Sequence, residues 1–161
     1  MISCGNRSTS TQGAAGAGGA PSAVAVPSGS PDAGAEVALP SLNMTMRLPK
    51  GAEVLVGGRK NSVRILLDPR ARAPRLVEIS PEGADSVPRG ASSQRELKGG
   101  GRLRYGVTQA GGGSGGPEVE LVGELTWGGR AYLVICRAQG ETPPAGDWCL
   151  PYLDALRLTE G

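Results

Sequence analysis

The segment from Glu118 to Cys136 constrains the fold more than any other part of the chain. In its first half, acidic residues alternate with apolar ones, which is typical of a strand with one dry and one solvated face. Gly128-Gly129 follows, a two-residue signal for a hairpin turn. The chain then returns as the nearly continuous apolar run AYLVIC, which is typical of a strand buried on both faces. The pattern therefore predicts an antiparallel hairpin whose second strand is central in a sheet.

The two-glycine turn also predicts the register of this hairpin. If these glycines form the loop, Leu125 faces Tyr132 and Leu121 faces Cys136 across the two strands. Side chains two residues apart point to the same face, so Tyr132 and Cys136 share the dry face with the two leucines. We therefore expect Cys136 to point into the core.

The C-terminal segment DWCLPYLDALRL predicts a helix that begins near Trp148. Asp147 can cap its first turn, and Pro151 is tolerated only in that turn. The apolar residues fall at the spacing of one helical stripe, which would lie across the dry face of the sheet. This stripe consists of Cys149, Tyr152, Leu153 and Leu156.

Alternating residues predict four further strands, around residues 44–48, 63–67, 76–79 and 103–107. Residues 57–62 are expected to form a hairpin turn, residues 80–101 mostly a surface loop, and residues 111–117 a hairpin tip. The predicted fold class is α+β: an antiparallel sheet of about six or seven strands with the C-terminal helix packed on one face.

Residues 1–41 differ from the rest in composition. Between Gly5 and Pro40 the chain consists mainly of Ala, Gly, Ser, Pro and Thr with almost no charge. Such a segment buries too little apolar area to offset its ordering entropy. The sequence therefore predicts a disordered tether over residues 1–41 and a globular domain over residues 42–161.

Two of the three cysteines are predicted to face the same helix–sheet interface. A disulfide between Cys136 and Cys149 would imply an oxidising compartment, and the alternative is two buried thiols. A metal site is disfavoured because the chain has no histidine and no Cys-x-x-Cys pair. We expect no metal and no cofactor.

The third cysteine, Cys4, follows Ile2 and Ser3 and precedes Gly5. Met1-Ile2-Ser3-Cys4 resembles the lipobox of bacterial lipoproteins, although Met1 stands where leucine is usual and no basic or apolar region precedes it. The resemblance implies a lipidated Cys4 that holds the protein to the membrane, with Gly5 suggesting the outer membrane and a periplasm-facing domain. If Cys4 is not lipidated, the protein is expected to be secreted.

The absence of histidine excludes the Ser-His-Asp and Cys-His nucleophile systems. Three carboxylates, Glu118, Glu120 and Glu124, line one predicted strand face and could in geometry support catalysis. Their alternation favours a solvated face instead. We therefore expect a protein that is not an enzyme, and a hydrolase relying on carboxylates is the least favoured alternative.

Charge is unevenly distributed although the net charge is only +2. Residues 1–41 carry −1, residues 42–104 carry +7 and residues 105–161 carry −4. Opposite charges interleaved on one solvated surface would explain this, and the alternative is a basic patch in segment 59–75. With few aromatics for stacking on bases, we expect no nucleic-acid partner. The candidate partner contacts are Arg64, Arg70, Arg72, Arg75, Trp127 and Trp148, the last two of which could instead cover the core edges.

The order of a glycine hairpin, the strand Tyr132-x-Val134-x-Cys136 and a terminal helix with Cys149 loosely resembles PsbP-like domains. That resemblance implies a domain that binds partner proteins. The sequence thus favours a non-enzymatic envelope lipoprotein that binds a protein or cell-wall partner. An immunity-type inhibitor of a periplasmic toxin is the second hypothesis.

Overall fold

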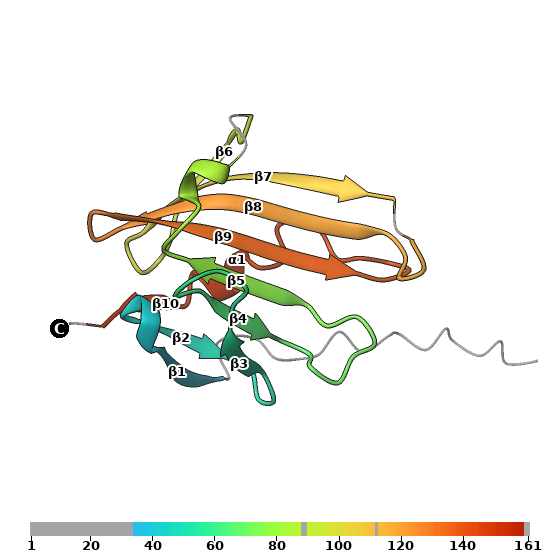
Figure 1. The fold of residues 1–161 in the computed structure, drawn as a ribbon, viewed down its shortest axis with the longest axis horizontal. Coiled ribbons are helices and arrows are strands. Elements are labelled where there is room, and N and C mark those ends of the chain that lie inside the picture. Colours follow the sequence, from blue (N-terminus) through green and yellow to red (C-terminus); the bar gives the residue numbers. More distant parts are fainter. Residues whose placement is uncertain (1–33, 88–89, 112, 160–161) are drawn as a thin grey trace, which may run out of the picture.

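Strands dominate the structure, a computed structural model that describes residues 34–87, 90–111 and 113–159 (Figure 1). Neighbouring strands are antiparallel throughout, in a seven-stranded sheet of order β3-β4-β5-β9-β8-β7-β6 and a three-stranded sheet of order β1-β2-β10. The large sheet comprises β3 (Glu53–Val56), β4 (Val63–Leu66), β5 (Leu76–Ser80), β6 (Ser93–Glu96), β7 (Arg102–Ala110), β8 (Glu118–Trp127) and β9 (Arg130–Gln139). The small sheet comprises β1 (Ala35–Leu39), β2 (Met44–Leu48) and β10 (Leu156–Leu158).

The β8–β9 hairpin has the predicted turn and register. Gly128 and Gly129 have φ values of 57° and 74°, a backbone conformation that favours glycine. Leu125 pairs with Tyr132, and every predicted pair along the hairpin is present. β9 occupies the middle of the seven strands, which confirms that the apolar run forms the central strand.

The apolar core lies between the two sheets. Alternate residues of β8 and β9 point into it, as do Met44, Met46 and Leu48 from β2. On the other face of β9, Leu133 packs against Val87 and Ala91, which follow a short 3₁₀ turn, η3 (Ala84–Ser86). β9 is therefore covered on both faces, which explains its uninterrupted run of apolar residues.

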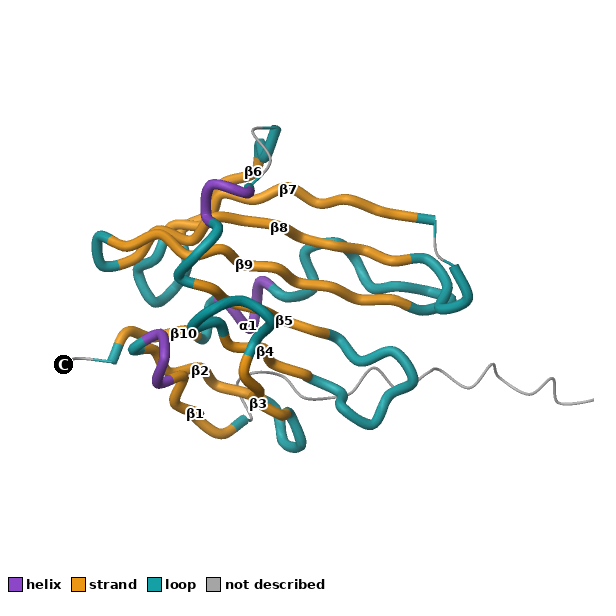
Figure 2. The backbone as a smooth tube through the Cα atoms, in the orientation of Figure 1, coloured by secondary structure: helices purple, strands orange, loops and turns teal. Residues whose placement is uncertain are grey.

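The predicted C-terminal helix is wrong in length. α1 (Leu150–Leu153) is a single turn, and the chain then enters β10, where Leu156 pairs with Met46 of β2 (Figure 2). Asp154 after the turn is buried and accepts hydrogen bonds from the Arg95 side chain and the Lys98 backbone N–H. The apolar stripe is buried in either conformation, so its spacing could not distinguish helix from strand. The fold is consequently mostly β, and none of its helices in the described part of the chain is long and apolar enough to cross a membrane.

The folded part of the chain begins earlier than the predicted boundary at residue 41. β1 lies within the expected tether and pairs with β2 along its whole length, from Ala35 opposite Leu48 to Leu39 opposite Met44. Leu39 is fully buried. β2 supplies the hydrogen-bonding partner and the apolar face, so β1 needs little apolar pattern of its own. Residues 1–33, with Cys4, lie outside the described residues.

Short strands account for the other differences. β3 was not predicted, and β6 interrupts residues 80–101, which were expected to be mostly surface loop. Both are four-residue strands at the edges of the large sheet. A strand of four residues is stabilised mainly by pairing with the adjacent strand, so its own sequence shows little periodicity.

A disulfide joins Cys136 of β9 to Cys149, the residue before α1. Both cysteines are fully buried, and their Cα atoms are 6.3 Å apart. Because α1 leads directly into β10, this bond connects the centre of the large sheet to the last strand of the small one.

Replacing both Cys136 and Cys149 with Ala should lower the free energy of unfolding by about 3 kcal/mol, because the bond closes a short loop in the unfolded chain. Urea unfolding monitored by tryptophan fluorescence measures this change. Cys4→Ala is the matched control and should leave the urea midpoint unchanged. Finding that both thiols of the wild-type protein react with an alkylating agent before reduction would contradict the bond.

Candidate functional site

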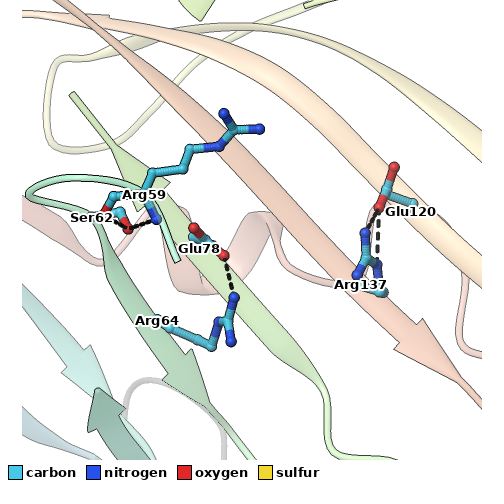
Figure 3. Close-up of polar contacts among 6 residues, drawn as sticks. All are labelled: Arg59, Ser62, Arg64, Glu78, Glu120 and Arg137. Atoms are coloured by element: carbon cyan, nitrogen blue, oxygen red, sulfur yellow. Dashed lines mark hydrogen bonds and ion pairs between the residues drawn. The ribbon is translucent and has the colours of Figure 1, made fainter. Parts of the chain in front are cut away.

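Charged side chains from four strands meet on the face of the large sheet that points away from the core, here called the outer face (Figure 3). Strand alternation places them there, because their sequence neighbours point into the core. β4 contributes Arg64, β5 contributes Glu78, β9 contributes Arg137, and β8 contributes Glu118 and Glu120. The site is therefore built on rigid, paired strands.

Arg64 and Glu78 form the first ion pair of this face. They are direct partners in the β4–β5 register, and Nη2 of Arg64 lies 3.1 Å from Oε2 of Glu78. The Glu78 side chain is only 9% exposed, whereas that of Arg64 is 40% exposed. Nε of Arg64 is also buried and has no hydrogen-bond partner among the residues that the structure describes. Arg64 is therefore the direct ion-pair partner of the nearly buried Glu78 carboxylate.

Arg137 forms the second group, with two carboxylates of β8. Its Nε donates to Oε2 of Glu120 at 2.9 Å and lies 3.2 Å from Oε1 of Glu118. The hydrogen bond to Glu120 raises the pKa of Arg137, and the charges of Glu120, Glu118 and Glu78 act in the same direction against the effect of burial. The guanidinium is thus held in place and stays charged.

Arg59 extends from the β3–β4 turn towards this face. Its backbone N–H donates to Ser62 Oγ at 3.0 Å, and the Ser62 hydroxyl donates to the Arg59 carbonyl at 2.7 Å. These bonds order the turn, and Figure 3 shows the Arg59 side chain extending away from the turn without a drawn contact to Glu78. Arg59 has no ion pair with any residue that the structure describes. It therefore offers an uncompensated positive charge beside the paired ones.

A hollow of about 650 Å³ opens at one end of the outer face. Three guanidinium groups line it, those of Arg64, Arg72 and Arg137, together with the carboxylates of Glu118 and Glu141. Arg72 is exposed and has no ion pair with a described residue. This arrangement suits exchange of ion pairs with another charged surface.

The four predicted arginine contacts do not form one patch. Arg64 and Arg72 line the same hollow, but Arg70 lines a different one. Arg75 bonds Asp68 at 2.7 Å and lies over the ring of Trp148, 5.4 Å from its centroid. Arg75 is therefore engaged within the molecule, and the basic segment 59–75 is divided among several surfaces.

The two tryptophans pack within the fold. Trp127 is only 7% exposed and belongs to the core, which excludes the prediction that it is an exposed partner contact. Trp148 is half-buried and packs edge-on against Tyr152, with ring centroids 6.3 Å apart. Both residues cover edges of the core, which was the alternative interpretation.

The three carboxylates of β8 are all paired with arginines. Glu124 lies 3.2 Å from Arg104 of β7, while Glu118 and Glu120 share Arg137. Paired carboxylates are typical of a structured, salt-bridged surface. Among the described residues, no three or more His, Cys, Asp or Glu side chains form a group that could hold a metal ion.

Sequence reasoning did not single out Arg59, Glu78 or Arg137. The predicted hairpin register contained the signal for Arg137, because one further pair along the strands places it opposite Glu120. Glu78 sits inside the short apolar run of β5, where a charged residue at an outward position indicates a partner on the next strand.

Comparison with known proteins identifies a family and a structure of similar fold. The family model described as type six secretion immunity 3 domain (Tsi3) matches residues 45–157. A crystal structure from Bacteroides thetaiotaomicron VPI-5482 is similar with a TM-score of 0.57 and 12% identity, covering 79% of this chain and 49% of that one. This chain thus spans about half the length of that protein, and the likeness concerns the fold alone. The search of curated proteins found no match.

Replacing Arg64 with Ala should lower the free energy of unfolding by about 1–3 kcal/mol, because Glu78 is left buried without its partner. The control is Arg102→Ala, whose pair with Glu96 joins two side chains that are 62% and 63% exposed. Such exposed pairs contribute little, so this variant should unfold close to the wild-type midpoint. Urea unfolding of both variants measures the difference, and equal effects would contradict a special dependence of Glu78 on Arg64.

Proposed function

The chain belongs to the type six secretion immunity 3 domain family, and on this premise we propose that it binds a toxin protein and blocks it without catalysis. The family match carries the proposal, since residues 45–157 include the whole large sheet and most of β2 and β10 of the small one. An inhibitor of this kind needs a stable complementary surface and no reacting groups. The absence of histidine and the arginine-paired carboxylates of β8 support that reading.

We propose the outer face as the surface that contacts the toxin. Its charges are fixed by the strand register and by their partners, which favours a specific rather than an adaptable surface. Arg59 and Arg72 lack ion pairs within the described chain and are exposed. These two guanidinium groups would pair with carboxylates of the toxin.

A toxin is favoured over a cell-wall component as the partner. Sugar rings commonly stack on exposed aromatic side chains, but Trp127 is buried and Trp148 is engaged with Arg75 and Tyr152. The outer face instead presents guanidinium and carboxylate groups, which are suited to a protein surface.

We further propose that the protein works in the bacterial envelope, attached to the membrane by lipidation of Cys4 and facing the periplasm. The order Ile2-Ser3-Cys4-Gly5 supports lipidation. The disulfide between Cys136 and Cys149 supports an oxidising compartment. Such an anchor would hold the domain where a toxin enters the periplasm.

The double variant Arg59→Glu with Arg72→Glu should bind the toxin at least about tenfold more weakly, because like charges then oppose the toxin's carboxylates. The test co-expresses each variant with the toxin, directed to the periplasm, and records survival and the dissociation constant. Arg47→Glu is the control, since Arg47 is exposed on the small sheet.

Urea midpoints of all three proteins should agree, which separates binding from folding. Full protection by the double variant would place the contact surface elsewhere. Failure of the wild-type chain to protect cells or to bind the toxin would overturn the immunity role.

Mass spectrometry of the protein extracted from envelopes should find acyl chains on Cys4, because the thiol is the acceptor in lipoprotein maturation. Cys4→Ser should move the protein from the membrane fraction to the soluble periplasmic fraction. An unmodified Cys4 thiol in the mature protein would contradict the anchor without affecting the immunity role.

A further inference from the structure

The two edges of the large sheet differ sharply in composition. The β6 edge reads Ser-Gln-Arg-Glu and is exposed at every position. The β3 edge reads Glu-Val-Leu-Val and also remains largely exposed. Edge strands normally carry charged residues, prolines or bulges that discourage pairing with another chain. β6 follows that rule, and β3, beyond its first residue, does not.

β3 exposes apolar side chains on both of its faces. Leu55 is 45% exposed on the outer face, and Val56 is 89% exposed on the opposite face. Only Val54 packs against the core. Leu55 and Val56 are two of the four large hydrophobic residues that are exposed among the described residues. Two of these four exposed residues are thus neighbours at the end of β3 that enters the turn to β4.

The hydrogen-bond pattern identifies the backbone groups that β3 leaves free. The Gly57 N–H donates to the Ser62 carbonyl at 2.9 Å and begins the ladder with β4. Bonded and non-bonded pairs alternate along an antiparallel ladder, so Leu55 points its backbone N–H and C=O to β4. The same groups of Val54 and Val56 point outward, away from β4.

Unpaired positive charges stand at both ends of this edge. Lys50 and Arg70 line a hollow of about 740 Å³ beside the start of β3. Lys60 lies in the turn at its other end and is exposed. None of the three has an ion pair with a residue in the described ranges, and Glu53 is the one acidic residue of β3. A second copy of this chain would bring like charges together, so the charge favours an acidic partner.

We propose that the free edge of β3 is a strand-addition site for an extended, acidic segment of a partner protein. The backbone groups of Val54 and Val56 would pair with that segment. A four-residue strand spans about 14 Å, so the segment needs four or five residues with carboxylates near both ends. The identification of this partner as the toxin rests on the proposed function. The assignment of the strand-addition site to β3 does not rest on it.

The probe is the peptide acetyl-Glu-Val-Thr-Val-Glu-amide, titrated into the ¹⁵N-labelled full chain. The amide resonances of Val54 and Val56 should shift and their hydrogen exchange should slow, because both N–H groups become bonded. The peptide with Lys at both ends should bind at least about tenfold more weakly.

Val56→Pro removes one outward N–H without removing a bond to β4, and it should abolish the response to the peptide. Gln94→Pro is the matched control on the β6 edge, where alternation from the Leu97–Gly101 bond points the Gln94 N–H outward. The double variant Lys50→Glu with Lys60→Glu offers a second test that leaves the backbone intact. It should reverse the preference from the acidic to the basic peptide.

Equal binding of the two peptides, or shifts confined to residues away from β3, would overturn the strand-addition site even if the chain neutralises the toxin. Failure of the immunity role alone gives a different result. If the acidic peptide pairs with β3 and the chain fails to bind the toxin, the edge site stands and the immunity role falls.

Discussion

The burial of β9 on both faces is the constraint on which the rest of the structure depends. One face, through Tyr132 and Cys136, closes the core between the sheets, and the other, through Leu133, receives the η3 segment. β9 must therefore have a strand on each side, β5 and β8, which satisfy its backbone groups. Towards the end of β9, beyond Ile135, the outer face is free of the apolar cover that lies over Leu133. The first outward residue there is Arg137, and for this reason the charged site lies at that end of the sheet.

That site divides into charges that are compensated and charges that are not. Glu78 is nearly buried and paired with Arg64, and Arg137 is paired with two carboxylates. These side chains are therefore fixed in position. Ion pairs within the protein contribute more to the shape of a binding surface than to its attraction for a partner. Attraction for a partner therefore falls to the exposed cations at the rim, Arg59 and Arg72. On the proposed function, the ion pairs keep this surface ordered when it is free, and the exposed cations select carboxylates of the toxin.

Sequence patterns predicted the parts of the fold that carry their own information. The glycine turn fixed the β8–β9 register because a one-residue slip would move every apolar side chain to the wrong face. β1 and β10 could not be predicted from their own residues, because each becomes ordered by pairing with β2. For β10, that partner strand lies far away in the sequence. The residues of the candidate site likewise differ in how far their own sequence context identifies them. Arg64 and Arg72 stood in a conspicuous basic segment, whereas the meaning of Glu78 emerges only when the register places it opposite Arg64.

Part of the excess positive charge of residues 42–104 lies around the β3 edge. An apolar edge strand is a template for pairing with copies of itself, and β3 lacks a proline or an internal charge to prevent it. The unpaired cations Lys50, Lys60 and Arg70 stand around that edge, where they oppose an identical, equally basic edge. The same charges attract an acidic strand. A single set of lysines and arginines therefore discourages self-association and selects the partner, so solubility and recognition impose the same requirement on this part of the chain.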